Sequence, residues 1–267
     1  MRLIKELIDL TGRRAVVTGG AGNVGLSVGE TLVELGADVA ILDKDPKACE
    51  DRVQFLASKS ANRVVPVPCD LTDEAGVRVA VQKIAETLDG LDIVVHCAAK
   101  VAASRKTGWA VPFGEQSVKA WEDAIRVELT SAFVLLQESR MMLEASGYGS
   151  VILFGSIYGS TGADMRLYEG TEMGNPVGYG VSKGGVLQLM RYLATIMAPK
   201  VRVNSISPGG IWRQQPDSFV KKYKHRTPAG RMATEEDIKG AIAYLASDLS
   251  AYVTGHNLVV DGGWTAW

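Results

Sequence analysis

The chain has 267 residues, 46% of them hydrophobic and 22% charged, a balance typical of globular proteins. Its net charge of −1 argues against nucleic acid as a partner, because phosphate binding needs a basic surface. No apolar run is long enough for a membrane span, and the polar start does not resemble a signal peptide. The three cysteines form neither a metal motif nor an even disulfide set. We therefore expect one domain over residues 1–267, in the cytoplasm, with no membrane partner and no metal.

Short β-branched segments alternate with helical segments along the whole chain. We predict strands at 15–17, 39–42, 63–67, 92–95, 150–154, 201–206 and 257–260. We predict helices at 24–35, 74–88, 119–145 and 235–247, and another that starts near 179. Apolar strands that alternate with helices indicate a parallel sheet covered on both faces. The predicted fold class is α/β, a single doubly wound Rossmann domain whose ligands bind beyond the carboxyl ends of the strands.

The first predicted strand ends in a glycine-rich turn, Thr18-Gly19-Gly20-Ala21-Gly22-Asn23-Val24-Gly25. Glycines in such a turn let backbone N–H groups approach a pyrophosphate at a helix N-terminus, where the helix dipole favours anions. A plain strand-to-helix turn rarely needs four glycines in so short a stretch. We therefore assign Gly19, Gly22, Asn23 and Val24 to the binding of a dinucleotide cofactor.

Acidic residues follow the second and third predicted strands. Asp43 closes the second strand, where a carboxylate can accept from both ribose hydroxyls and would repel a 2′-phosphate. Lys44 is a weak signal for NADP, but the glycine turn carries no arginine, so NAD is the predicted cofactor. Asp70, followed by Leu71, could contact the adenine edge or cap the next helix, and the spacing leaves both open.

Tyr179 and Lys183 are four positions apart at the start of a long predicted helix, so they share one helix face. An ammonium close to a phenol favours the phenolate, which makes the phenol a usable proton donor and acceptor near neutral pH. The pattern is common by chance and gains force only if a dinucleotide fold lies upstream and a hydroxyl donor lies near.

With these pieces in place, the chain resembles the short-chain dehydrogenase/reductase family over essentially its whole length. The shared features are the glycine turn, Asp70, Tyr179 with Lys183, Ser207-Pro208-Gly209 and Val260-Asp261-Gly262-Gly263. The resemblance implies that Tyr179 is the acid/base, that Lys183 holds the nicotinamide ribose, and that Ser156 donates to the substrate oxygen. It also implies a dimer or tetramer and cofactor contacts from Leu71, Ala98, Pro208, Gly209 and Ile211.

Several features depart from the family pattern. Asn23 stands where glycine is usual, and His96-Cys97-Ala98-Ala99 replaces the usual Asn-Asn-Ala-Gly, so both segments have an epimerase character. Glu128 replaces the asparagine of the family's proton relay, and we count it among the catalytic residues because an acid could still order water. Ser156 and Tyr179 lie further apart in the chain than the family usually has, which indicates an insertion.

The inserted residues fall at about 159–176, in a loop that leaves the predicted catalytic strand and returns at Tyr179. Such a loop must overhang the pocket, and long loops in compact domains are usually functional, although a neutral surface insertion is the alternative. We assign Tyr158, Arg166 and Tyr168 to substrate binding, and also Arg213 from a substrate or lid region at about 209–234. Cations in three loops suggest an anionic substrate: Lys100, Arg105, Lys106, Arg166 and Arg213.

The predicted helix 119–145 has more apolar surface than one sheet face should cover, which indicates packing between identical chains or else an unusually broad core face. The residues concerned are Ile125, Leu129, Phe133, Leu136, Met141 and Met142.

Residues 168–171 and 207–211 are similar to the flagellin-modification dehydrogenases of bacterial sugar biosynthesis, which implies a polar, sugar-like substrate. We therefore predict an NAD-dependent oxidoreductase that interconverts a secondary alcohol and a ketone on a small polar, sugar or phosphosugar molecule. Two alternatives stay open. The glycine turn suggests a nucleotide-sugar epimerase or dehydratase, and Glu128 suggests a non-catalytic dinucleotide-binding sensor or scaffold.

Overall fold

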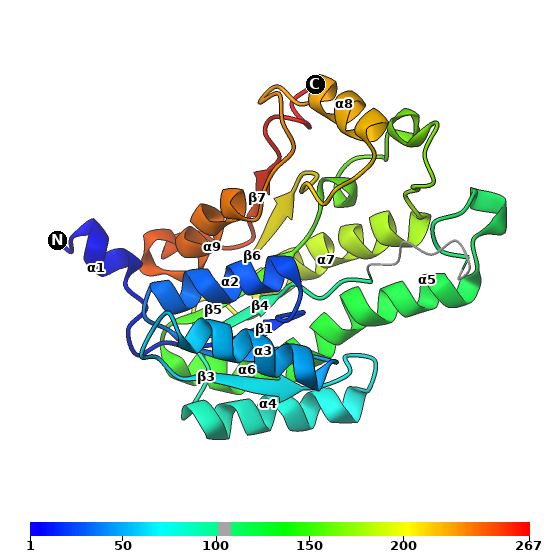
Figure 1. The fold of residues 1–267 in the computed structure, drawn as a ribbon. Coiled ribbons are helices and arrows are strands. Elements are labelled where there is room, and N and C mark those ends of the chain that lie inside the picture. The colour runs from blue at the N-terminus through cyan, green and yellow to red at the C-terminus, as the bar shows by residue number, and fades with distance from the viewer. Residues whose placement is uncertain (101–107) are drawn as a thin grey trace.

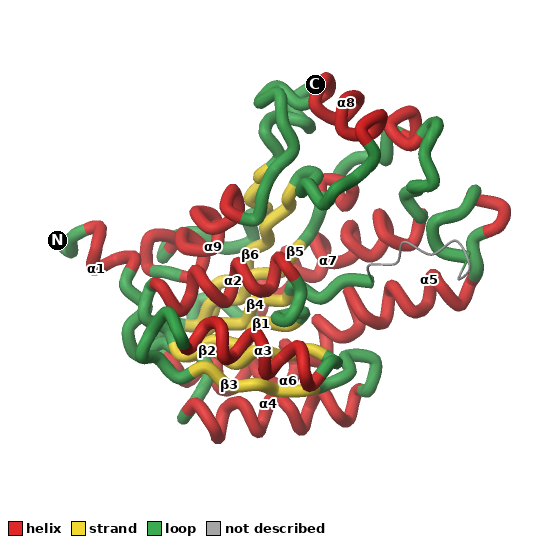
Figure 2. The backbone as a smooth tube through the Cα atoms, in the orientation of Figure 1, coloured by secondary structure: helices red, strands yellow, loops and turns green. Residues whose placement is uncertain are grey.

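The computed structural model describes residues 1–100 and 108–267. Within these residues, seven parallel strands form one sheet in the order β3-β2-β1-β4-β5-β6-β7 (Figures 1 and 2). The strands are β1 (Arg14–Thr18), β2 (Asp38–Asp43), β3 (Val64–Pro68), β4 (Ile93–His96), β5 (Gly149–Phe154), β6 (Val201–Pro208) and β7 (Asn257–Val260). The strand order reverses between β1 and β4, so the crevice where ligands bind in this fold lies beyond the ends of these two strands.

Helices cover both faces of the sheet (Figure 1). One face carries α2 (Asn23–Glu34), α3 (Pro46–Ala57) and α9 (Lys239–Ala246), and the other carries α4 (Glu74–Leu88), α6 (Ser131–Ser146) and α7 (Val177–Ile196). Successive residues of β1 alternate between the two cores: Ala15 and Val17 pack under α2, and Val16 packs under α4 and α6. The predicted single-domain doubly wound α/β fold is confirmed.

Helix α3 was not among the predicted elements. Its N-terminus has clear signals, because the Asp45 carboxylate accepts from the Ala48 N–H at 3.0 Å and Pro46 occupies the first turn. Only Cys49 and Leu56 are buried along the helix, so its apolar periodicity is weak. A short first helix, α1 (Ile4–Ile8), has no buried residue and was missed for the same reason.

The predicted helix 119–145 contains a local change of winding. It consists of α5 (Val118–Ile125), a π-helical turn η3 (Arg126–Thr130) and α6. The Ser131 N–H donates to the Arg126 carbonyl, five residues back, instead of the usual four. A π-turn inserts an extra residue and often marks a functional site. Glu128 lies in this turn.

A third, smaller core lies beyond the carboxyl ends of β5, β6 and β7. Figure 1 shows α8 (Asp217–Arg226) and the C-terminus side by side in this part of the molecule. They pack with two short 3₁₀ turns, η4 (Ile157–Gly159) and η5 (Met165–Tyr168). We call the following buried residues the lid core: Ile157, Leu167, Phe219, Tyr223, Met232 and Trp264.

The inserted segment 159–176 is attached to α8 by polar contacts as well as by the lid core. Lys222 Nζ donates to the carbonyls of Arg166 and Glu169 at 2.8 and 3.0 Å. Arg226 lies 3.7 Å from the Asp164 carboxylate, and its guanidinium stacks 4.5 Å above the Trp264 ring. The insertion is therefore part of a packed unit and not an isolated surface loop.

Candidate active site

Tyr179 and Lys183 lie in the first two turns of α7, as the sequence predicts. Lys183 is buried, and its Nζ donates to the Phe154 carbonyl at the end of β5 at 2.9 Å. The same nitrogen lies 5.8 Å from the centroid of the Tyr179 ring. Tyr179 is half-buried. The ammonium is thus held beside the phenol at the carboxyl edge of the sheet.

Glu128 is fully buried and provides the countercharge to Lys183. Its Oε2 lies 3.5 Å from Lys183 Nζ and accepts from the Ser182 hydroxyl at 2.8 Å. Its Oε1 accepts from the backbone N–H of Lys100 at 3.1 Å. Two charges withdrawn from water are tolerated only with such good geometry and added hydrogen bonds. The residue that replaces the family's asparagine is therefore a fixed carboxylate in contact with the lysine.

His96 connects this ion pair to the glycine turn. Its Nδ1 lies 2.8 Å from Thr18 Oγ1, and its Nε2 lies 3.2 Å from the Glu128 carbonyl. Burial, reinforced by the Lys183 ammonium, lowers the pKa of His96 to about 3, so the imidazole is neutral at physiological pH. A neutral ring can donate to the Glu128 carbonyl while its other nitrogen accepts from Thr18.

Ser156 follows β5 and is 5% exposed. Its Oγ accepts from the Tyr158 N–H at 3.2 Å, which leaves its hydroxyl hydrogen available to donate to a substrate oxygen. The segment after Ser156 lies directly on α7: a methyl group added at Gly159 would meet the Lys183 backbone at 2.8 Å. The fold thus brings Ser156 to the helix turns that carry Tyr179 and Lys183.

The glycine turn has the geometry of an anion cradle. Gly19 has φ +64, and a Cβ there would lie 2.8 Å from Ala98 Cα. A Cβ at Gly25 would lie 2.1 Å from the Gly19 carbonyl, so α2 packs on the turn only because residue 25 is glycine. Within the described residues, the N–H groups of Asn23, Val24 and Gly25 have no acceptor. These open donors at a helix N-terminus fit the pyrophosphate of a dinucleotide.

Two side chains hold the backbone of Ala21 in the glycine turn: Asp43, and Arg52, which the sequence analysis missed. Asp43 Oδ2 accepts from the Ala21 N–H at 3.2 Å, and Arg52 Nε donates to the Ala21 carbonyl at 3.1 Å. Asp43 Oδ1 accepts from the Lys44 N–H at 2.8 Å. Arg52 lies on α3, the helix that was not predicted, so no motif pointed to it.

Asp70 forms a local turn before α4. Its Oδ1 accepts from the N–H and the hydroxyl of Thr72, both at 2.9 Å, and these bonds hold the pKa of Asp70 below its usual range. The N-cap residue of α4 is Asp73, so Asp70 does not cap the helix as the sequence alternative suggested. Oδ2 makes no hydrogen bond to another described residue, so it can still face a ligand. Leu71 is half-buried and packs against the core under α4.

The remaining predicted cofactor residues follow β4 and β6. The Ala98 N–H lies 3.4 Å from Thr18 Oγ1. Pro208 ends β6, and the Gly209 N–H donates to the Val260 carbonyl at 2.9 Å. Ile211 forms an isolated parallel bridge with Ala233. All of them therefore lie at the same carboxyl edge as Asp43 and Lys183.

The described cations that were predicted to bind an anionic substrate are each paired with a carboxylate. Lys100 Nζ lies 2.9 Å from Asp123, and Arg213 pairs with Glu235. Arg166 is 77% exposed at its side chain and makes two 2.8 Å hydrogen bonds to Asp164. Arg105 and Lys106 lie outside the described residues. The described residues thus give no support for the predicted anion site.

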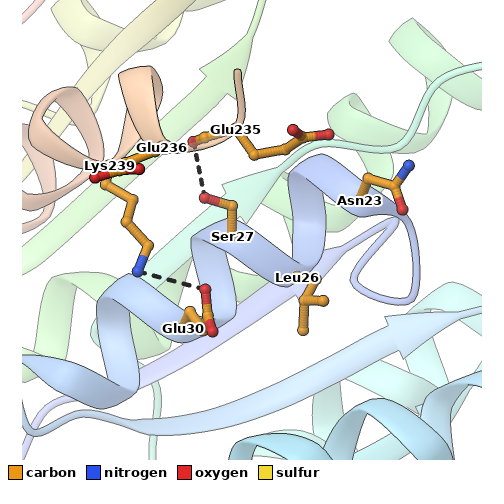
Figure 3. A pocket seen from close by; sticks show the side chains of 7 residues that line it. All are labelled: Asn23, Leu26, Ser27, Glu30, Glu235, Glu236 and Lys239. Atoms are coloured by element: carbon orange, nitrogen blue, oxygen red, sulfur yellow. Dashed lines mark hydrogen bonds and ion pairs between the residues drawn. The ribbon is translucent and has the colours of Figure 1, made fainter. Parts of the chain in front are cut away.

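A pocket of about 370 Å³ lies between α2 and the segment 235–239 (Figure 3). Ser27 Oγ donates to the Glu235 carbonyl at 3.0 Å, and Lys239 pairs with Glu30 at 3.4 Å. The pocket contains Asn23 but neither Ser156 nor Tyr179, so we do not assign the chemistry to it. Across residues 1–100 and 108–267, no cluster of His, Cys, Asp or Glu could hold a metal ion. In the same residues, no helix has the length and apolar character needed to span a bilayer.

A parallel doubly wound sheet, an open N–H cradle after β1 and a tyrosine–lysine–serine cluster after β5 define a class of dinucleotide-binding oxidoreductases. The family model described as "Enoyl-(Acyl carrier protein) reductase" matches residues 19–265. The chain belongs to the short-chain dehydrogenase/reductase family, whose members act as oxidoreductases on alcohols and ketones.

Its relatives differ in their substrates. The chain is 32% identical to cis-4-hydroxycyclohexanecarboxylate dehydrogenase of Sinomonas cyclohexanicum, over 95% of this chain and 97% of that protein. It is 28% identical to sorbose reductase of Schizosaccharomyces pombe, over 97% and 98%. A solved short-chain dehydrogenase from Leptospira borgpetersenii with bound NAD⁺ is 31% identical, with a TM-score of 0.85, over 99% and 96%.

The close contact at Gly25 gives a test of the cradle. Gly25→Ala places a methyl group against the Gly19 carbonyl, so the turn must shift. We expect the affinity for NADH to fall at least about tenfold, the effect of about 1.4 kcal/mol, measured by fluorescence titration. Gly240→Ala in α9 is the control, because a Cβ there meets nothing within 4 Å. Equal affinity in the two folded variants would contradict the proposed cradle.

Proposed function

We propose that this protein is an NAD-dependent dehydrogenase that interconverts a secondary alcohol and a ketone on a small polar molecule. The observation that carries the proposal is the position of the Lys183 ammonium, 2.9 Å from the Phe154 carbonyl and 5.8 Å from the Tyr179 ring. Ser156 lies on the neighbouring segment with a free hydroxyl hydrogen.

The nicotinamide cofactor, when bound, supplies or accepts the hydride. Side chains of the protein transfer the proton. Ser156 donates to the substrate oxygen and fixes it, Tyr179 gives that oxygen a proton or takes one from it, and Lys183 stabilises the phenolate. The Phe154 carbonyl directs the ammonium so that it cannot turn away from the phenol.

Glu128 contributes through Lys183 and does not need to touch the substrate. The carboxylate lies 3.5 Å from the amine as its countercharge, and its bonds to Ser182 and to the Lys100 N–H fix its orientation. We therefore propose it as a positioning residue of the site. The intact Ser156, Tyr179 and Lys183 arrangement favours an enzyme over a non-catalytic sensor or scaffold.

The choice of NAD rests on Asp43. Its carboxylate is fixed at the glycine turn, where it can accept from ribose hydroxyls and would repel a 2′-phosphate. The bound NAD⁺ in the Leptospira neighbour agrees with this choice. Arg52, which donates to the Ala21 carbonyl, argues for NADP instead, since an arginine there can meet a 2′-phosphate.

For the substrate, the names of the two relatives suggest a polar alcohol or ketone such as a hydroxylated ring or a sugar. The free cysteines Cys49 and Cys69 are buried and agree with a reducing cytoplasm. Exposed apolar side chains on α6 and α7, including Phe133, Met141 and Tyr192, agree with the proposed homo-oligomer.

Tyr179→Phe removes the proton donor and leaves the ring in place. With a panel of cyclic alcohols, ketoses and polyols, followed by nicotinamide absorbance, we expect kcat to fall about 10²- to 10⁴-fold. Tyr252→Phe, at a fully exposed tyrosine, is the matched control and should keep the wild-type rate. An active wild type whose rate survives Tyr179→Phe would show that another group moves the proton.

Asp43→Ala removes the carboxylate that faces the ribose. We expect the affinity for NAD⁺ to fall about tenfold or more, because a hydrogen bond to a charged group contributes about 1.5–3 kcal/mol. Affinity for NADP⁺ should rise relative to NAD⁺. Asp51→Ala, on the exposed side of α3, controls for the loss of one charge. A wild type that prefers NADP⁺ would make the assigned cofactor wrong.

Glu128→Gln keeps the size and one of the two acceptor oxygens of the side chain but removes its charge. The phenolate of Tyr179 then forms beside an ammonium with no countercharge, so it forms more easily. We expect the pH of half-maximal alcohol oxidation to move downward, measured as kcat/KM against pH. Glu122→Gln, an exposed residue on α5, is the control. An unchanged pH profile in a stable Glu128→Gln variant would limit Glu128 to a structural role.

A further inference from the structure

Two tyrosines and an asparagine form a chain of polar groups beside the proposed catalytic residues. The hydroxyls of Tyr158 and Tyr168 lie 3.2 Å apart, and Asn175 Nδ2 donates to the Tyr168 hydroxyl at 3.3 Å. Tyr158 belongs to η4 and Tyr168 to η5, and Asn175 precedes α7. All three residues are half-buried, so solvent or a ligand can reach them.

The chain of polar groups formed by Tyr158, Tyr168 and Asn175 begins next to Ser156. Tyr158 is two residues after Ser156, and its N–H donates to Ser156 Oγ at 3.2 Å. A Cβ at Gly180 would lie 3.3 Å from the Tyr158 carbonyl, so the residue also lies against the turn that carries Tyr179. The Tyr158 backbone therefore contacts both Ser156 and the turn of Tyr179, and its phenol is near enough to the Tyr179 phenol for an electrostatic effect.

Aromatic contacts hold both phenols in place. The Tyr158 ring meets Trp264 edge to face with centroids 5.9 Å apart, and the Tyr168 ring lies 5.3 Å from Phe219. Trp264 and Phe219 belong to the lid core. Because the rings are fixed before a ligand arrives, binding costs them little side-chain entropy.

The hydrogen bonds leave part of the Tyr158 hydroxyl open. The Asn175 amide nitrogen can only donate, so the Tyr168 oxygen accepts from it, whereas either phenol can be the donor in the bond between Tyr158 and Tyr168. In both cases the Tyr158 oxygen keeps a lone pair that no donor among the described residues uses, so it can accept from a ligand hydroxyl. Burial, with smaller effects from neighbouring phenols including Tyr179, raises the pKa of Tyr158, so the group stays neutral.

The charged side chains around these three polar residues do not favour the binding of an anion. Lys100, Arg166 and Arg213 are each paired with a carboxylate. Lys222, on α8, is occupied by two backbone carbonyls of the insertion. The segment thus offers neutral hydrogen-bonding groups, which recognise hydroxyl or carbonyl oxygens.

We infer that the Tyr158 hydroxyl, held by Tyr168 and Asn175, binds a second hydroxyl of an uncharged polyhydroxylated substrate, a ketose or its polyol. The inference rests on the proposed function and specifies its substrate class. A site built to bond a substrate hydroxyl discriminates against an analogue that lacks it, because its own polar group is then left without a partner.

The test compares reduction of L-sorbose, cyclohexanone and D-fructose 6-phosphate by the wild type, Tyr158→Phe and Asn175→Ala. We expect the wild type to prefer L-sorbose. In Tyr158→Phe, the ratio of kcat/KM for L-sorbose to that for cyclohexanone should fall about tenfold, the upper effect of one neutral hydrogen bond. Asn175→Ala should lower the ratio by a smaller factor, and Tyr252→Phe is the matched control.

An unchanged ratio in a folded Tyr158→Phe variant would overturn the inference. Wild-type activity on cyclohexanone without activity on L-sorbose, or a preference for D-fructose 6-phosphate, would also overturn it while leaving the dehydrogenase function intact. A wild type that reduces none of the three ketones would count against the proposed function, and the inference would fall with it.

Discussion

The site depends on one buried ammonium. Lys183 loses its water shell on folding, and such a group is stable only if fixed partners replace that water. The partners come from two other elements: the Phe154 carbonyl at the end of β5 and the Glu128 carboxylate in the π-helical turn. The amine therefore couples the position of α7 to the sheet and to η3. Any rearrangement that moved Tyr179 relative to the sheet would first have to break this cluster.

The π-helical turn explains how a carboxylate can occupy that position. An added residue in a helix rotates the side chains around it, and here the Glu128 side chain is directed into the interior toward Lys183 while the Glu128 carbonyl meets His96. His96 stays neutral, so the cluster contains one positive and one negative charge. The neutral imidazole and the Thr18 hydroxyl then link this balanced pair to the strand that carries the glycine turn.

The sheet and the positions of Ser156, Tyr179 and Lys183 could be predicted from the sequence because they depend on local patterns. Each of these features depends only on residues that are close together in the sequence: the continuous apolar strands, the glycines after β1 and the spacing of Tyr179 and Lys183. Contacts between distant segments could not be predicted. Arg52 reaches the glycine turn from a helix with little apolar periodicity, and the cations near the pocket are paired with carboxylates that no spacing rule identifies. The π-turn likewise has no proline or glycine to mark it.

The lid core limits how the region around residues 159–176 could change during evolution or redesign. The insertion, α8 and Trp264 near the C-terminus share the same buried side chains, although they are far apart in the chain. A grafted copy of residues 159–176 would leave Leu167 and Tyr168 without their partners in another scaffold. Inherited or engineered changes of selectivity should therefore involve all three segments together, and recombination points that separate them should be poorly tolerated.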